Sequence, residues 1–323
     1  MSKLLLCVAL LAMLVTARAS RAADIDFASW LQGLRSDALA SGVRATTLDA
    51  ALANVQPIPR IIELDRKQPE FTVSFDQYLA RAAGDARVAE GKAKLRERRA
   101  LLEEVGAKYQ VQPRFIVALW GIETDFGKHT GGYPVVAALA TLAYDGRRAG
   151  FFRNELLQAL SIIDHGHVSP TAMIGSWAGA MGQNQFMPSS FTRYAVDHDG
   201  DGRRNIWTSL PDVFASTANY LRQVGWRDDL TWGREILLPQ GFDLKLADLE
   251  VKKPLAEWQR LGVRRTDGGP LPQRDMVASI VIPAKSAQPA FLVYDNYRAL
   301  MRWNKSLFFA TAVGMLSDRI GDG

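Results

Sequence analysis

A single glutamate stands near the end of an apolar segment, Pro113–Gly127, that has the pattern of a helix. Ile116, Trp120 and Glu123 recur at i, i+4 and i+7, so the carboxyl group follows an apolar stripe instead of a charged face. Desolvation raises the pKa of such a carboxyl group, which suits a general acid working near neutral pH. Gly127 is expected to close the helix with a left-handed cap. The alternative is a helix-terminal glutamate that points to water, because most glutamates are solvated.

Alternating aspartates mark a second stretch, DHDGDGRRNIWTSLPD at residues 197–212. Oxygen ligands at alternate positions followed by glycine at the sixth match the first half of an EF-hand calcium loop, in which position seven offers a backbone carbonyl. Position twelve is Thr208 instead of glutamate, but Asp212 would supply that carboxylate in a longer loop. The alternative is a metal-free Asx-turn loop. The predicted ligands of a structural cation are Asp197, Asp199, Asp201, the carbonyl of Arg203, and Asp212.

Neutral amides and aromatic rings come together in GSWAGAMGQNQFMPSSF, residues 175–191. Its three glycines within eight residues let the backbone pass close to a ligand or to another element. The amides of residues 183–185 are groups that neutral sugar recognition uses, and a tight structural turn is the alternative. Arg147 and Arg148 lie in an earlier predicted loop, where they are either solvated or bind carboxylates of a glycan.

The elements that must position these groups are mostly helices. Apolar residues at helical spacing indicate a helical domain over 24–105 and a helical core over 106–228 and 293–323, the latter including loop 197–212. Short β-branched or apolar runs separated by proline and glycine predict a small β-rich domain over 229–292. The expected fold class is therefore mainly α (α+β).

The first 23 residues have the pattern of a secretory signal peptide. Lys3 precedes an apolar run that is too short to span a bilayer, and small residues follow. Cys7, the only cysteine, lies inside this run, so the mature chain would contain no disulfide. We expect a soluble periplasmic product without a lipid anchor. Cleavage lowers Lys plus Arg from 39 to 36 against 34 acids, so the formal net charge falls from +5 to +2, and nothing indicates a nucleic-acid partner.

Six stretches, in this order, resemble the B-type lytic murein transglycosylases, glycoside hydrolase family 103 of the lysozyme-like superfamily. They are WGIETDFG at 120–127, ALATLAYDGRRAGFF at 138–152, GSWAGAMGQNQFMPSSF at 175–191, AVDHDGDGRRNIW at 195–207, TANYLRQVGW at 217–226 and YDNYRALMRWNKS at 294–306. The resemblance covers nearly the whole mature chain. It implies a lysozyme-like helical catalytic core, with a helical domain before it and a small β domain inserted late.

The resemblance makes Glu123 the single catalytic carboxylate. As an acid it would protonate the glycosidic oxygen between N-acetylmuramic acid and N-acetylglucosamine. As a base it would then take the proton of the muramoyl C6 hydroxyl as that oxygen attacks C1. The product would be a 1,6-anhydromuramoyl end formed without water, and no cofactor would be needed for catalysis. The second carboxylate of an ordinary glycosidase is not required, and Asp125, two residues further along the helix, would face elsewhere.

The same resemblance implies further site residues and partners. Arg147 and Arg148 would face lactyl or peptide carboxylates, and the aspartate loop would hold Ca²⁺. The residues that would line the sugar-binding cleft are Ser176, Gln185, Tyr220, Tyr294 and Asn296. Peptidoglycan glycan strands are the implied partner, with cell-wall synthases as additional candidates. We expect no nucleic acid, no membrane span and a monomer.

Two other functions are compatible with these residues. A hydrolytic muramidase on the same scaffold would hold a water opposite Glu123 and would release reducing ends. A glycan-binding protein without turnover is the third hypothesis. It is disfavoured because binding alone gains nothing from placing Glu123 on an apolar helix face.

Overall fold

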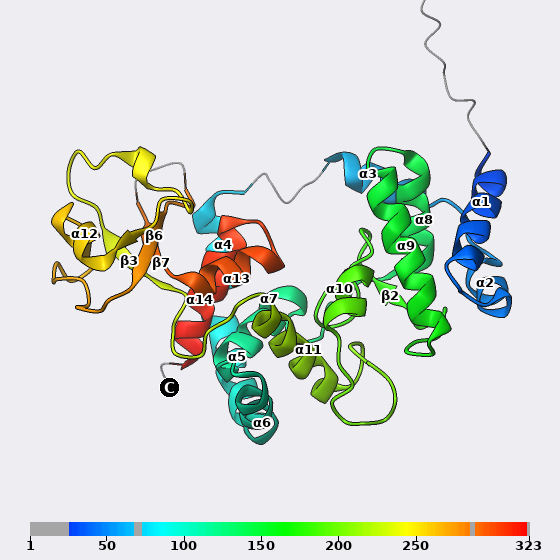
Figure 1. Ribbon diagram of the computed structural model, residues 1–323, viewed down its shortest axis with the longest axis horizontal. Helices are drawn as coiled ribbons and strands as arrows, with labels where there is room; N and C mark the ends of the chain where they lie inside the picture. The colour runs from blue at the N-terminus through cyan, green and yellow to red at the C-terminus, as the bar shows by residue number, and fades with distance from the viewer. Residues whose placement is uncertain (1–25, 68–72, 285–287, 322–323) are drawn as a thin grey trace, which may run out of the picture.

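The computed structural model describes residues 26–67, 73–284 and 288–321. Over these residues the chain is mainly helical with a small β-sheet, as predicted (Figure 1). The predicted signal peptide, residues 1–23, lies outside the described residues. None of the described helices is both long enough and apolar enough to cross a membrane.

One group of helices forms the end of the molecule that carries the described N-terminus (Figure 1). Its members are α1 (Phe27–Ala40), α2 (Ala45–Leu52), α3 (Pro59–Lys67), α8 (Val135–Asp145) and α9 (Ala149–Asp164). Thr47 of α2 donates a hydrogen bond to Asp164 at the end of α9, with an oxygen–oxygen distance of 2.5 Å. The ring of Phe27 packs edge-on against Tyr144, with 5.2 Å between centroids. These contacts attach the first helices to the α8–α9 pair.

A second group of helices forms the middle of the molecule around α7. Its members are α4 (Phe75–Ala82), α5 (Asp85–Glu97), α6 (Arg99–Tyr109), α7 (Pro113–Thr124), α10 (Pro188–Tyr194), α11 (Leu210–Gln223), α13 (Asp295–Trp303) and α14 (Leu307–Gly321). Helix α7 contacts α5, α6, α11 and α14, and every residue from Phe115 to Gly121 is buried. Pro113 occupies the first turn, where its missing N–H breaks no helical hydrogen bond. The described residues of segment 24–105 are thus divided between the two groups of helices, and the predicted domain boundaries stay a prediction.

The β-structure is antiparallel and falls into two sheets. The smaller one pairs β1 (Tyr133–Pro134) with β2 (Ile174–Gly175). The larger one has the order β4-β6-β7-β3-β5 and lies at the other end of the molecule from α1 (Figure 1). Its strands are β3 (Gly233–Leu237), β4 (Lys253–Pro254), β5 (Arg264–Arg265), β6 (Val277–Val281) and β7 (Ala290–Val293). The short helices η2 (Leu244–Leu246) and α12 (Leu255–Arg260) accompany it.

The larger sheet joins two hydrophobic cores. Ile280 and Leu292 pack with Trp258 in a small core of the β-rich part. Val281 and Phe291, which alternate with them along the strands, belong to the large helical core. Successive residues of a strand point to opposite faces, so one sheet serves both cores. This arrangement sets the β-rich part directly against the helices.

Candidate active site

The end of α7 presents Glu123 through an unusual turn of the backbone. The helix ends at Thr124, and the next three residues all have positive φ: 51° at Asp125, 59° at Phe126 and 87° at Gly127. The predicted cap at Gly127 is therefore wrong in position, since Asp125 is the left-handed capping residue. The reason is that the chain turns back at once: the Phe126 N–H donates to the Trp120 carbonyl at 3.2 Å, and their rings lie 5.5 Å apart.

Glu123 is half-buried and accepts a hydrogen bond from the indole of Trp303, with 2.6 Å between Nε1 and Oε1. Burial raises the pKa of Glu123 to about 7, and the hydrogen bond from Trp303 acts in the opposite direction. The apolar stripe of α7 predicted the direction of this shift. Such a carboxyl group is part protonated near neutral pH, so it can give a proton and then take one back.

Asp125, the carboxylate nearest to Glu123 along the chain, is held by two cations. Arg87 of α5 lies 3.4 Å from it and Lys128 lies 3.3 Å from it. Burial alone would raise the pKa of Asp125, but the hydrogen bond and charge of Lys128, together with Arg87, outweigh this and lower it. Asp125 therefore stays an anion bound to α5 and the following loop.

A ring cluster surrounds the partner of Glu123. The Trp303 ring lies 5.2 Å from Phe186 and 4.7 Å from Tyr220 between centroids. The Tyr220 hydroxyl donates to the carbonyl of Arg302 at 2.7 Å, and its ring lies 4.4 Å from that of Tyr194. Of the predicted cleft residues, Tyr220 is thus brought next to the group that binds Glu123.

Two of the amides in the glycine-rich stretch serve the fold. Gln183 accepts from the Trp120 indole at 2.8 Å and donates to the Trp207 carbonyl at 2.9 Å. Asn184 is 1% exposed and donates to Val213 and Thr217. Gly182 has φ of 63°, and a Cβ there would lie 2.6 Å from a backbone oxygen. The structural alternative therefore holds for these two amides.

Ser176 and Gln185 are half-buried members of the same stretch. The Ser176 hydroxyl oxygen accepts from the Ala180 N–H at 3.0 Å. The Gln185 amide donates to the carbonyls of Thr130, at 3.1 Å, and Gly182, at 3.0 Å. Both side chains hold the turn, and their contact with a sugar stays a prediction.

The structure places Tyr294 and Asn296 inside the protein. Tyr294 is 3% exposed, belongs to the small core, and accepts a 3.0 Å hydrogen bond from Arg234. Asn296 is 0% exposed; its amide accepts from the Arg227 N–H and donates to the carbonyls of Arg227 and Leu230. These contacts show that both residues stabilise the fold. Their buried position does not support the predicted contact with substrate.

Arg147 and Arg148 both bind Asp65, a buried residue of α3. Their nitrogens lie 2.6 Å and 2.7 Å from the same carboxylate oxygen. Hydrogen bonds from the arginines hold the pKa of Asp65 below its usual value, although burial opposes them. The pair fastens α3 to the loop before α9, while each side chain remains over 40% exposed. Binding of a glycan carboxylate there stays a prediction.

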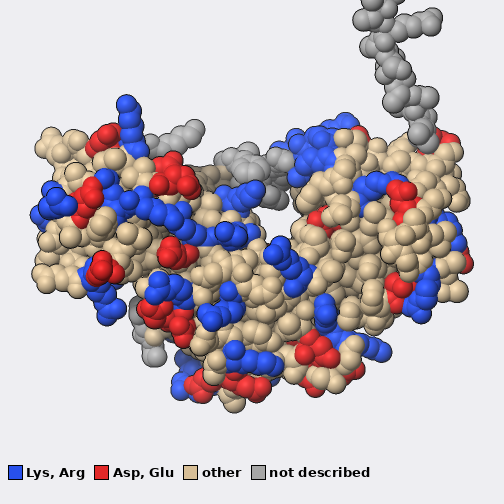
Figure 2. All heavy atoms as spheres, viewed as in Figure 1, with Lys and Arg blue, Asp and Glu red and all other residues tan. Residues whose placement is uncertain are grey.

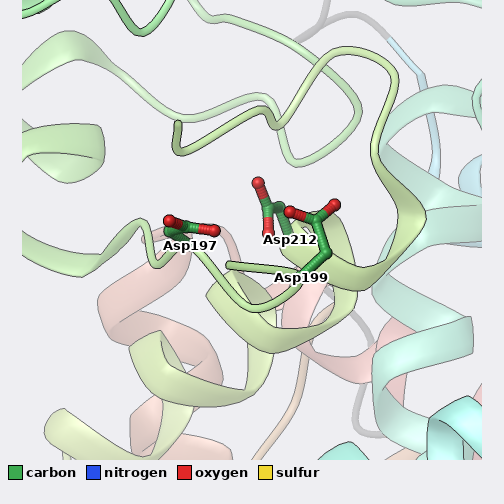
Figure 3. A group of neighbouring side chains, drawn as sticks. All are labelled: Asp197, Asp199 and Asp212. Carbon is green, nitrogen blue, oxygen red and sulfur yellow. The ribbon is translucent and has the colours of Figure 1, made fainter. Parts of the chain in front are cut away.

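The carboxylates of Asp197, Asp199 and Asp212 gather beside the start of α11 (Figure 3). One oxygen of each lies within 4.8 Å of the others. Asp201 is outside this group, and its carboxylate accepts from the Arg203 N–H at 2.8 Å. The carbonyl of Arg203 stays a predicted ligand. Burial, and to a lesser degree the charge of Asp199, raise the pKa of Asp212 despite hydrogen bonds from the backbone N–H groups of His198 and Asn205. Three hard oxygen donors converging on one point are suited to a Ca²⁺ ion.

Charged residues of both signs are spread over the face shown in Figure 2. The same view shows a deep notch between the α8–α9 end and the part that carries α13 and α14. Helices α7 and α11 lie in the middle of the molecule, beneath that notch in Figure 1. The contact between Glu123 and Trp303 joins the ends of α7 and α13.

Comparison with known proteins identifies the family. The model of the transglycosylase SLT domain matches residues 26–318. The chain belongs to the transglycosylase SLT domain family. The match spans both helical groups and the β-rich part, so family membership extends over the whole described fold.

Relatives within the family include B-type enzymes. The chain is 33% identical to membrane-bound lytic murein transglycosylase B of Escherichia coli over 225 residues, which are 66% of this chain and 58% of that enzyme. SltB3 of Pseudomonas aeruginosa, in complex with NAG-NAM-pentapeptide, has a TM-score of 0.89 and 49% identity over 92% of this chain and 80% of that one. Slt35 of Escherichia coli, in complex with calcium, has a TM-score of 0.77 and 26% identity over 90% and 92% of the two chains. The resemblance to B-type lytic murein transglycosylases and the lysozyme-like fold are confirmed.

Trp303 is the site residue that sequence reasoning missed. It lies in the stretch 294–306 that resembles the B-type lytic murein transglycosylases, but its contact with Glu123 joins positions 180 residues apart. The spacing of apolar residues along one helix does not predict a contact between two distant helices. A tryptophan at the end of an amphipathic helix was the only available signal.

Proposed function

We propose that this protein is a lytic transglycosylase of peptidoglycan. It cleaves the β-1,4 bond between N-acetylmuramic acid and N-acetylglucosamine without water and forms 1,6-anhydromuramoyl ends. Membership of the SLT domain family supports this proposal, as does likeness to SltB3, whose structure holds NAG-NAM-pentapeptide. The observation that carries it is the partly desolvated Glu123, whose pKa is about 7.

Glu123 performs both proton transfers in this reaction. Its carboxyl group first gives a proton to the glycosidic oxygen as the C1–oxygen bond breaks. The resulting carboxylate then takes the proton of the C6 hydroxyl, whose oxygen forms the new bond to C1. Glu123 ends protonated, as it began, and the intramolecular nucleophile provides proximity in place of a bound water. Asp125 takes no part because Arg87 and Lys128 hold it as an anion.

Ser176, Gln185 and Tyr220 are proposed to line the sugar-binding cleft. Support comes from their places: Ser176 and Gln185 are half-buried in the glycine-rich turn, and Tyr220 packs on the indole that binds Glu123. Tyr294, Asn296, Arg147 and Arg148 would reach substrate only after giving up contacts described above.

The test is mass spectrometry of the soluble products formed by the purified protein from intact murein sacculi. The proposal expects anhydromuramoyl ends, which are lighter by one water than reducing ends. Reducing ends would make the protein a hydrolase. Binding to the sacculi without release of fragments would make it a glycan-binding protein.

We also propose a structural Ca²⁺ held by Asp197, Asp199 and Asp212 in the EF-hand-like loop. The gathered carboxylates and the calcium complex of Slt35 support it. When bound, the ion would neutralise the three carboxylates and tie the loop to α11. It supplies no step of the reaction, which runs on Glu123 alone.

The predicted signal peptide lies outside the described residues. We propose that residues 1–23 are a signal peptide, that the mature protein works as a soluble monomer in the periplasm on glycan strands, and that cell-wall synthases are additional partners. The residue pattern from Lys3 onward supports export. Amino-terminal sequencing of the protein recovered from a periplasmic fraction tests the cleavage.

A further inference from the structure

The Trp303 indole is fixed on several sides. Phe186 and Tyr220 pack against its ring. The Tyr220 hydroxyl donates to the carbonyl of Arg302, the neighbouring residue in α13. Trp303 is the last residue of α13, whose cap N–H at Asn304 donates to the Leu300 carbonyl. The ring therefore has little freedom to turn, and the direction of its N–H is set by the fold.

An indole nitrogen only donates hydrogen bonds and accepts none. The Glu123 oxygen that faces it, Oε1, must therefore act as an acceptor whether Glu123 is charged or neutral. In a neutral carboxyl group the carbonyl oxygen is a better acceptor than the hydroxyl oxygen, so the indole favours the form in which Oε1 is the carbonyl oxygen and the proton is on Oε2. Among the described residues, none makes a hydrogen bond to Oε2.

We propose that Trp303 is a positioning residue that holds Oε1 of Glu123, so that Oε2 is the single oxygen that gives and later takes back the proton. This inference rests on the proposed transglycosylase function. One oxygen then meets the glycosidic oxygen in the first step and the C6 hydroxyl in the second. Trp303 itself touches neither reacting group and changes no bond.

The electrostatics of the site agree with this geometry. A hydrogen bond from an N–H group to a carboxylate stabilises the anion more than the neutral acid. Trp303 therefore limits the rise in pKa that burial imposes on Glu123. Burial raises the pKa of Tyr220 of α11, which packs on the indole, to about 12. Arg302 of α13 is exposed.

The experiment compares Trp303→Phe with the unchanged protein. Phenylalanine keeps a ring against Phe186 and Tyr220 but removes the N–H. We expect anhydromuramoyl ends still to form, with kcat lowered about tenfold or more because the carboxyl group is no longer held. The limb of the pH–rate profile on which activity falls with rising pH should move up by about one unit, because the anion has lost its donor.

Trp258→Phe is the matched control. Its indole donates to the Ala278 carbonyl at 3.0 Å in the small core, away from Glu123. Loss of that bond should lower the melting temperature without moving the pH profile. A Trp303→Phe profile that coincides with that of the unchanged protein would overturn the proposal, because a merely structural tryptophan would behave like Trp258.

A second measurement does not depend on the folding of Trp303→Phe. In the unchanged protein, the indole ¹H–¹⁵N signal of Trp303 should shift with a midpoint near pH 7, and the shift should be missing in Glu123→Gln. An indole signal that does not follow the titration of Glu123 would overturn the proposal. If instead Glu123→Gln retained full activity, the catalytic role of Glu123 in the proposed function would fail, and the two failures are thereby distinguished.

Discussion

Two carboxyl groups, half-buried Glu123 and buried Asp212, differ in what surrounds them. Burial raises the pKa of both. Glu123 meets one indole donor, and no neighbouring carboxylate contributes to its pKa. Asp212 takes two backbone N–H donors and lies beside Asp197 and Asp199. Burial alone therefore does not determine the role of a carboxyl group. Glu123, with a single hydrogen-bond donor, can exchange a proton, whereas Asp212, with two carboxylates beside it, forms a site suited to a cation.

The largest expected effect tests the first half of this comparison. Glu123→Gln should lower the release of anhydromuramoyl products from sacculi by at least about 10³-fold, since both proton transfers are lost. Asp125→Asn is the matched control, because asparagine tolerates the left-handed backbone of that position. It should retain activity within about tenfold. Equal losses in the two variants would contradict the assignment of a single catalytic carboxylate.

The pH dependence of Glu123 gives the next effect. The protonated form starts the reaction, so the rate should fall about tenfold per unit above a pH of about 7. The folded pKa lies above the usual value of 4.5, so the folded state binds more protons than the unfolded state between these two values. The free energy of unfolding should therefore decrease from about pH 4.5 to about pH 7. Thermal melts should show this slope in the unchanged protein and less of it in Glu123→Gln.

Binding of Ca²⁺ tests the part of the comparison that concerns Asp212. At about a hundredfold excess over its Kd, Ca²⁺ should raise the melting temperature by about 5–10 °C. Asp212→Asn should abolish most of this rise, because it removes the buried charge. Asp201→Asn, outside the group of three carboxylates, should keep it. Scanning calorimetry with and without chelator measures both, and an equal response of the two variants would contradict the proposed ligand set.

The smallest effect separates structural amides from substrate-binding ones. Asn184→Ala should lower the free energy of unfolding by about 2 kcal/mol, since two buried hydrogen bonds are lost. It should leave KM for a soluble muropeptide chain within about twofold. Gln185→Ala should instead raise KM several-fold if this residue contacts sugars. Chemical denaturation measures the free energy of unfolding of both variants, and steady-state kinetics measures their KM. A raised KM in Asn184→Ala would contradict the structural role of Asn184.

Much of the fold was predictable because its signals are local. Apolar spacing placed the helix around Trp120 and Glu123, and proline and glycine indicated the β-rich part that carries β3 to β7. The cap of α7 was not predictable in position, because Phe126 turns back onto Trp120 and places the left-handed residue at Asp125. The division of 24–105 between two groups of helices was also hidden, since it depends on which distant helices each segment contacts.

The sequence by itself determined that Glu123 follows an apolar stripe and that alternating aspartates could meet around a cation. Both features lie within a few helical or loop residues, where spacing sets geometry. Only the tertiary structure decided that Trp303 donates to Glu123, that Asp201 lies outside the group formed by Asp197, Asp199 and Asp212, and that Asn296 is buried. Such contacts depend on the packing of segments that are distant in the sequence. The free energy of a hydrogen bond or of burial depends on the folded surroundings of a residue as well as on its type.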